Sequence, residues 1–203
     1  MAGRLSLTPP GRAWVALAAL LAFGAIVAWW APAVWLDWQP ALAAIEPWRA
    51  WTAAFVHWSA LHLAANLGAT AAVAALGWAA RVPPVAALAW AVAWPLTHVG
   101  LLLRQELAHY GGLSGLLHAG VAVVVLWLLA AGQGRQRVVG ALVGAGLVAK
   151  LLFEQPWGPV LRHAAEWDIA LAPLAHATGA VAGLICGALA LRACRGGVRQ
   201  FGS

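Results

Sequence analysis

Charged side chains are scarce in this sequence. Of the 203 residues, 9% are charged and 64% are hydrophobic, whereas an ordinary soluble domain has about 25% charged residues. A water-soluble protein of this composition would lack the polar side chains needed to cover its surface. The composition therefore predicts a protein embedded in a lipid bilayer.

Cysteine is also rare, which excludes a fold held together by disulfides. The two cysteines, Cys186 and Cys194, lie eight residues apart near the end of one expected helix. That separation along a helix is too long for a disulfide bond. We therefore expect two free thiols with structural roles.

Acidic residues are outnumbered by basic ones, and the net charge is +6. The basic residues occur singly or in pairs between apolar runs, and they form no basic face that alternates with aromatic residues. This distribution argues against nucleic acid as a partner and is typical of the loops of a membrane protein.

Long apolar runs are what the sequence does contain. About 20 apolar residues span a hydrocarbon core as a helix, and proline, glycine and arginine separate six such runs. The first run is long enough to span and lacks a signal-peptide cleavage site, so we expect it to be retained. The six predicted spans are 13–31, 57–79, 84–103, 113–131, 137–155 and 171–192. They form one domain, 13–192, with cytoplasmic tails at 1–12 and 193–203.

The distribution of basic residues predicts the orientation in the membrane. With a cytoplasmic N-terminus, eight basic residues fall inside and three fall outside, which satisfies the positive-inside rule. Both termini are then cytoplasmic, and the long loops 32–56 and 156–170 face outward. The inner residues are Arg4, Arg12, Arg81, Arg135, Arg137, Arg192, Arg195 and Arg199, and the outer ones are Arg49, Arg104 and Arg162.

Three of the predicted spans carry polar residues near their outer ends. His62 and Asn66 are four residues apart and share one face of the second span. Ser114 and His118 begin the fourth span, and His176 lies in the sixth. Because these spans all run from outside to inside, their polar groups lie at a similar depth and can converge on one site.

The residue types at that depth suit acyl transfer. A serine hydroxyl becomes a nucleophile when a neighbouring base, usually histidine, takes its proton. The side chains of His62 and Asn66 can donate hydrogen bonds to the oxyanion that forms. Ser114 is at the start of a helix, where unpaired N–H groups favour negative charge.

These residues resemble the motifs of the rhomboid family of intramembrane serine proteases. The GxSG motif is Gly112-Leu-Ser114-Gly115, and the HxxxN motif is His62 to Asn66. The AHxxGxxxG motif of the last span runs from Ala175-His176 through Gly179 to Gly183, and Trp48-Arg49 matches a Trp-Arg pair of the first outer loop. The resemblance covers all six spans.

The resemblance implies an all-α, six-span bundle and a serine endopeptidase that cleaves a transmembrane segment of a protein substrate. Ser114 would be the nucleophile and His176 the base, in a dyad without an acidic third member. His62, Asn66 and the Ser114 N–H would form the oxyanion hole. The helix-packing glycines would be Gly112, Gly115, Gly179 and Gly183. No metal or other cofactor is implied.

Within the family, the chain resembles the rhombosortase branch. The features that carry this resemblance are the compact chain, His118 after GLSG, and Lys150 and Glu154 near the outer end of the fifth span. That branch implies a bacterial cytoplasmic (inner) membrane location with the active site open to the outer side. Its substrates are exported surface proteins with a C-terminal Gly-Gly motif, an apolar helix and a basic tail.

Other interpretations of single residues stay open at this point. Ser114 alone would be typical of helix packing, and His118, one turn from Ser114, is a second candidate base that more naturally packs beside His176. Lys150 and Glu154 have the i, i+4 spacing of an ion pair, or they contact a substrate tail.

Two other functions deserve comparison. A catalytically silent rhomboid-like protein would bind transmembrane helices, but such proteins usually lack the serine or the histidine. A haem-binding electron carrier would use paired histidines on facing helices, but this function leaves Ser114, Asn66 and the glycine motifs without a role.

Overall fold

Helices account for most of the chain in the computed structural model, which describes residues 9–200 and side chains through residue 194. The α-helices are α1 (Arg12–Ala28), α2 (Arg49–Thr52), α3 (Ala60–Ala79), α4 (Pro84–Val99), α5 (Ser114–Ala131), α6 (Arg135–Glu154) and α7 (Pro173–Gln200). Short 3-10 helices lie at Ala33–Trp35, Pro40–Leu42, Ala53–Phe55 and Gly100–Leu103. The protein is an all-α membrane bundle.

Among the described residues, five helices are long and apolar enough to cross a membrane: α3, α4 with its 3-10 extension to Leu103, α5, α6 and α7. They correspond to the last five predicted spans. The first predicted span, 13–31, corresponds to α1, which is shorter at 17 residues. Helix α7 continues past the predicted boundary at 192 to Gln200. Residues 1–8 with Arg4, residues 201–203, and the side chains of Arg195 and Arg199 lie outside the described part of the chain.

Local sequence signals explain where the main helices begin and end. The Ser59 hydroxyl caps α3 by accepting a hydrogen bond from the His62 N–H, as N-terminal serines commonly do. Pro84 is the first residue of α4, where its missing N–H costs nothing. Gly132 is the C-cap of α5, and Gln155, the C-cap of α6, adopts a left-handed conformation.

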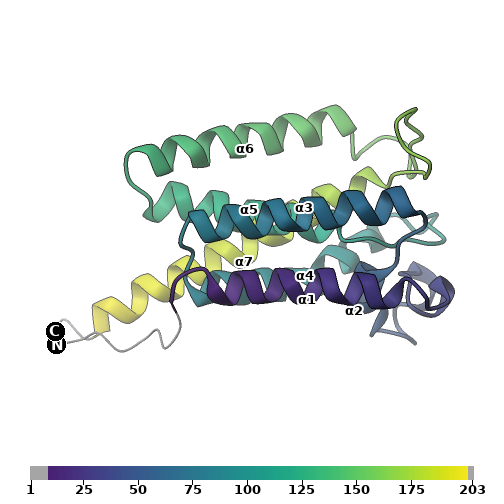
Figure 1. Ribbon diagram of the computed structural model, residues 1–203, viewed down its shortest axis with the longest axis horizontal. Coiled ribbons are helices and arrows are strands. Elements are labelled where there is room, and N and C mark those ends of the chain that lie inside the picture. The colour runs from purple at the N-terminus through teal and green to yellow at the C-terminus, as the bar shows by residue number, and fades with distance from the viewer. Residues whose placement is uncertain (1–8, 201–203) are drawn as a thin grey trace.

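The long helices run alternately in opposite directions along one axis (Figure 1). Helix α5 is central and packs against α3, α4, α6 and α7, while α1 packs against α3 and α4. Helix α1 begins and α7 ends at the same end of the bundle (Figure 1). The connections that follow α1, α4 and α6 gather at the opposite end, and that end carries the candidate site.

The interior of the bundle is organised around two tryptophans. Trp14 and Trp90 stack with ring centroids 4.3 Å apart. Their indole N–H groups donate to the carbonyl oxygens of Val73 and Leu116, so the polar edge of each ring is satisfied inside an apolar core. These contacts tie α1, α3, α4 and α5 together.

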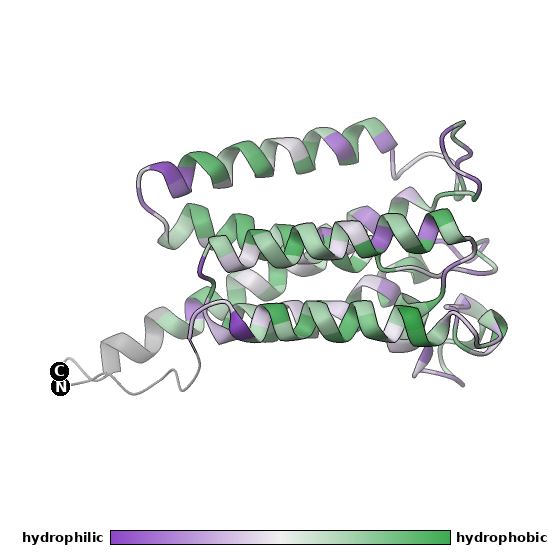
Figure 2. Cartoon of the chain, in the orientation of Figure 1, coloured by the Kyte–Doolittle hydropathy of each residue, from purple (hydrophilic) through white to green (hydrophobic). Residues whose placement is uncertain are grey.

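The outer surface of the helices is apolar. Large exposed side chains include Phe23, Leu88, Leu142 and Phe153. Figure 2 shows hydrophobic residues along the lengths of the helices, with hydrophilic residues concentrated at helix ends and in connections. An apolar exterior of this extent suits contact with lipid chains.

The connection between α1 and α3 is held by a buried arginine. Arg49 donates to the carbonyl oxygens of Val34 and Asp37 and pairs with the carboxylates of Asp37 and Glu46. Asp37 also contacts His109, with Oδ2 and Nδ1 2.6 Å apart. Loop 29–59 is therefore bonded to the segment that precedes α5, and His109 is part of this contact.

Candidate active site

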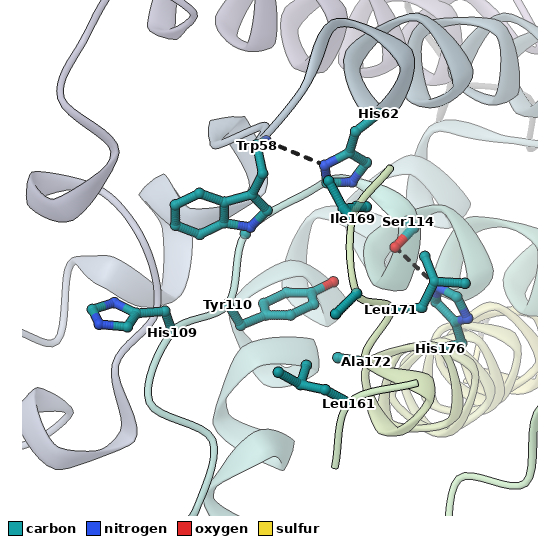
Figure 3. A pocket seen from close by; sticks show the side chains of 12 residues that line it. Trp58, His62, His109, Tyr110, Ser114, Leu161, Ile169, Leu171, Ala172 and His176 are labelled. Atoms are coloured by element: carbon teal, nitrogen blue, oxygen red, sulfur yellow. Dashed lines mark hydrogen bonds between the residues drawn. The ribbon is translucent and has the colours of Figure 1, made fainter. Parts of the chain in front are cut away.

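Ser114 and His176 meet between α5 and α7. Ser114 is the first residue of α5, and His176 lies in the first turn of α7. The Ser114 Oγ is 2.9 Å from His176 Nε2 (Figure 3). This is the distance expected when a hydroxyl donates a hydrogen bond to an unprotonated ring nitrogen.

Glycines allow the two helices to approach this closely. A Cβ atom on Gly179 would lie 1.9 Å from the Gly115 carbonyl oxygen, and one on Gly183 would lie 2.2 Å from that of Ala119. Both distances are far below any real contact, so the two backbones touch at these positions. Such small-residue packing is typical of helices in membranes, and here it brings Ser114 against His176.

His62 and Asn66 lie beside the GxSG loop, as their shared helix face predicts. Both are buried. A Cβ atom on Gly112 would be 2.8 Å from His62 Nε2 and 3.6 Å from Asn66 Nδ2, and Gly112 has a φ of +130°. Only glycine suits this position, because the backbone conformation and the space both disfavour a side chain.

The hydrogen bond made by His62 Nδ1 shows that Nε2 is the nitrogen that can donate. His62 Nδ1 accepts from the Trp58 N–H at 3.4 Å (Figure 3). A neutral imidazole that accepts at Nδ1 carries its proton at Nε2. The nitrogen that faces the GxSG loop is therefore a hydrogen-bond donor, as an oxyanion site requires.

His118 does not contact the serine hydroxyl. Its Nδ1 lies 2.6 Å from the Ser114 carbonyl oxygen, one turn earlier in the same helix. Its ring stacks on that of His176, with centroids 4.2 Å apart and planes 14° from parallel. The geometry thus gives His176 the hydrogen bond to Ser114 and places His118 against the face of that base.

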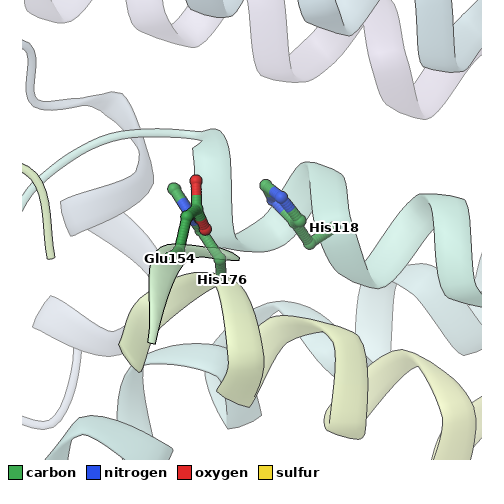
Figure 4. Close-up of side chains that lie close together, drawn as sticks. All are labelled: His118, Glu154 and His176. Carbon is green, nitrogen blue, oxygen red and sulfur yellow. Dashed lines mark hydrogen bonds and ion pairs between the residues drawn. The ribbon is translucent and has the colours of Figure 1, made fainter. Parts of the chain in front are cut away.

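The structure differs from the dyad implied by the resemblance, because an acidic residue contacts the histidine. Glu154 Oε2, at the end of α6, lies 2.6 Å from His176 Nδ1, and Figure 4 shows the side chains of His118, Glu154 and His176 close together. Lys150 donates to the other carboxylate oxygen, Oε1. The ion pair between Lys150 and Glu154 is therefore present, and the same carboxylate also reaches the histidine.

The close group of His118, Glu154 and His176 also has the composition of a metal site, with ligand atoms within 4.8 Å of one another. Two features disfavour that use. Both ring nitrogens of His176 already have partners, and the two imidazole rings stack face to face. Nitrogen lone pairs lie in the ring plane, so stacked rings do not direct them at one ion.

A small cavity of about 40 Å³ opens beside Ser114. Its walls include Tyr110, Trp58 and residues of the connection before α7, such as Leu161 and Ile169 (Figure 3). Predicted loop 156–170 thus covers one side of the site. The Ser59 hydroxyl donates to Asp168 at 2.7 Å, which joins this loop to the start of α3.

Two residues near the site were not predicted from the sequence to have a role there. The Tyr110 hydroxyl is buried beside Ser114, and burial raises its pKa. Tyr110 lies four residues before Ser114, and this proximity was the available signal. His57 contacts the His62 ring, with centroids 4.7 Å apart, and burial lowers its pKa from 6.5 to about 4.

No protein-family model matches this chain. No curated protein matches it either. The functional argument therefore rests on the motifs and on the geometry of the site.

Proposed function

We propose that this protein is an intramembrane serine endopeptidase of the rhomboid type. The observation that carries the proposal is the 2.9 Å contact between Ser114 Oγ and His176 Nε2. It joins two helices of a membrane bundle at the place where His62 and Asn66 supply hydrogen-bond donors. A packing role for Ser114 would require none of these neighbours.

The reaction follows the chemistry of acyl transfer. Ser114 Oγ attacks the carbonyl carbon of the scissile peptide and forms the new C–O bond, while its proton passes to His176 Nε2. The π electrons of the carbonyl move to its oxygen, and His62, Asn66 and the Ser114 N–H donate to the resulting oxyanion. When the C–N bond breaks, its electron pair leaves with the amine nitrogen, which takes the proton from His176. Water then hydrolyses the acyl-enzyme by the same steps.

The substrate class is the one that the rhombosortase resemblance implies. The proposed substrates are membrane-anchored surface proteins with a C-terminal Gly-Gly motif, an apolar helix and a basic tail.

The orientation of the chain determines which side of the membrane the site faces. Ser114 and His176 lie near the end of the bundle where the connections after α1, α4 and α6 gather (Figure 1). The bias of basic residues assigns that end to the outer side. We propose six spans, with α1 as the first, and cytoplasmic termini in a bacterial inner membrane.

Covalent labelling with a fluorescent fluorophosphonate tests the activated serine. We expect the detergent-purified parent to be labelled, and Ser114→Ala and His176→Ala to lose labelling at least about 100-fold, because the nucleophile and its base act as a unit. His163→Ala is the matched control, since His163 is exposed and lies outside the cavity. Labelling in His176→Ala together with its loss in His118→Ala would make His118 the base.

Cleavage of a reporter tests the reaction itself. The reporter carries a Gly-Gly motif, an apolar helix and a basic tail, and we expect the parent to release its soluble part and Ser114→Ala to leave it intact. A folded parent that neither labels nor cleaves would contradict the proposal and favour the silent helix-binding protein.

A further inference from the structure

The carboxylate of Glu154 is in direct contact with the candidate base. Its Oε2 lies 2.6 Å from His176 Nδ1, on the opposite side of the ring from the nitrogen that meets Ser114. The side chains of His176 and Glu154 are 8% and 14% exposed, so little water competes for this contact. Ser114, His176 and Glu154 therefore form a continuous chain of hydrogen bonds from α5 through α7 to α6.

We infer that Glu154 is a positioning residue that completes a Ser114–His176–Glu154 triad, an inference that rests on the proposed function. A carboxylate at Nδ1 accepts the Nδ1–H hydrogen bond and so leaves the Nε2 lone pair free for the Ser114 hydroxyl. It also stabilises the imidazolium that forms when His176 takes the serine proton. Glu154 takes no proton itself and remains a carboxylate throughout.

The position of Glu154 is unfavourable for α6 by itself. It is the last residue of the helix, where the helix dipole disfavours a negative charge. Its i, i+4 pair with Lys150 also has the less favourable order, with the cation on the N-terminal side. A carboxylate placed against these local preferences is consistent with a role in the site.

The surroundings of Glu154 hold the carboxylate in one orientation. Lys150 donates to Oε1 and leaves Oε2 for His176. Arg162 donates to the carbonyl oxygen of Phe153 at 3.0 Å and so secures the end of the helix. Because both carboxylate oxygens are engaged within the protein, a positioning role explains the residue better than a contact with a substrate tail.

The variant Glu154→Gln keeps the size of the side chain but removes the carboxylate that is proposed to position His176. Lys150 would bond the amide oxygen, so the amide NH₂ would face His176 Nδ1. His176 would then have to accept at Nδ1 and carry its proton at Nε2, where it can no longer take the serine proton. We expect kcat for the Gly-Gly reporter to fall about 100-fold or more with KM within threefold. Glu166→Gln, at an exposed position, is the matched control and should retain parental kcat.

A double variant gives a result that a purely structural role would not produce. In Lys150→Met with Glu154→Gln, no cation selects the amide oxygen, so the amide can rotate and present its oxygen to His176 Nδ1. We expect the double variant to recover about tenfold in kcat over Glu154→Gln alone. A shared loss of thermal stability in both variants, without this recovery, would overturn the inference.

The remaining outcomes are distinct. If Glu154→Gln retains kcat within threefold of the parent, or raises KM alone, Glu154 does not position His176, although loss of cleavage in Ser114→Ala would still uphold the proposed function. If the parent itself shows no cleavage that depends on Ser114, the proposed function fails and the triad fails with it.

Discussion

Helices α6 and α7 both contact α5, but they do so very differently. Along α7, Gly179 and Gly183 bring backbone against backbone. Along α6, only Gly140 is buried, and a Cβ atom on Gly146 would meet nothing within 4 Å. Figure 1 shows α6 at the edge of the bundle and α7 within it. The contact of α7 with α5 leaves no space for a methyl group, whereas the contact of α6 with α5 leaves much of α6 exposed.

The two contacts carry different parts of the candidate site. Ser114 and His176 come from the tightly packed pair, so the distance between the reacting atoms depends on backbone contact. Glu154 comes from α6, and its place depends on side-chain bonds to Lys150 and His176. The nucleophile and base are thus located by packing, whereas the carboxylate is located by charge and hydrogen bonding.

The largest effects should follow from breaking the α5–α7 contact. A Cβ atom added to Gly179 or Gly183 would lie 1.9 Å or 2.2 Å from a backbone oxygen of α5. One added to Gly187 would lie 3.2 Å from the side-chain atom Leu126 Cδ1. We expect Gly179→Ala and Gly183→Ala to lower fluorophosphonate labelling at least about 100-fold and to destabilise the protein by about 1–3 kcal/mol. Gly187→Ala should keep labelling within threefold, because a side-chain end can move.

Gly146→Ala on α6 is the matched control for this series, since the same methyl group enters open space there. Labelling rates and thermal melting in detergent measure both effects. Equal tolerance of alanine at Gly179 and Gly146 would show that the closeness of α5 and α7 does not determine the site.

A smaller effect should follow from weakening the attachment of Glu154. Lys150→Met removes the cation that engages one carboxylate oxygen but leaves the contact with His176. We expect kcat for the Gly-Gly reporter to fall about three- to tenfold, of the size of a partly exposed ion pair, with KM unchanged. Of the twelve basic residues, Lys150 is the only lysine and the others are arginines. Arg137→Met also removes a positive charge from α6, so it is the control for loss of charge alone. A rise in KM with constant kcat would instead favour contact with a substrate tail.

Substitution of His57 should have the smallest effect on the site. It also gives an independent measure of how the stability of the protein depends on pH. The pKa of His57 is lowered from 6.5 to about 4 by burial, so the folded protein holds it neutral while the unfolded chain binds a proton below pH 6.5. The stability from neutral His57 is present above pH 6.5 and is lost as the pH falls from 6.5 through 4, by up to about 3 kcal/mol. Thermal melting between pH 7 and 4 should be less pH-dependent in His57→Gln, and an unchanged slope would contradict this.

Sequence patterns predicted the parts of the site that depend on local spacing. His62 and Asn66 share a helix face because they are four residues apart, and Gly179 and Gly183 do so for the same reason. The motif order also placed Ser114 and His176 on helices that can meet. The contact of Glu154 with His176 was not predicted, because it spans two helices and the connection between them, and its i, i+4 spacing with Lys150 already offered a sufficient partner.

The connections at the site end of the bundle show the same limit. Arg49 holds the connection between α1 and α3 through the carbonyl oxygens of Val34 and Asp37. The contact of Asp37 with His109 joins residues 72 positions apart, and no periodicity relates such residues. Trp38 is likewise buried in a cluster with Tyr110 and Leu107, which lie far from it along the chain.

Membrane character, the approximate helix positions and the faces that carry Ser114, His62 and His176 follow from the sequence, because apolar run length and helical periodicity are local properties. Which side chains touch was decided by the tertiary structure. The approach of α7 to α5 and the bend of the chain after α6 bring Ser114, His176 and Glu154 within hydrogen-bonding distance. That selection depends on packing between distant segments, and the spacing of residues along the chain does not encode it directly.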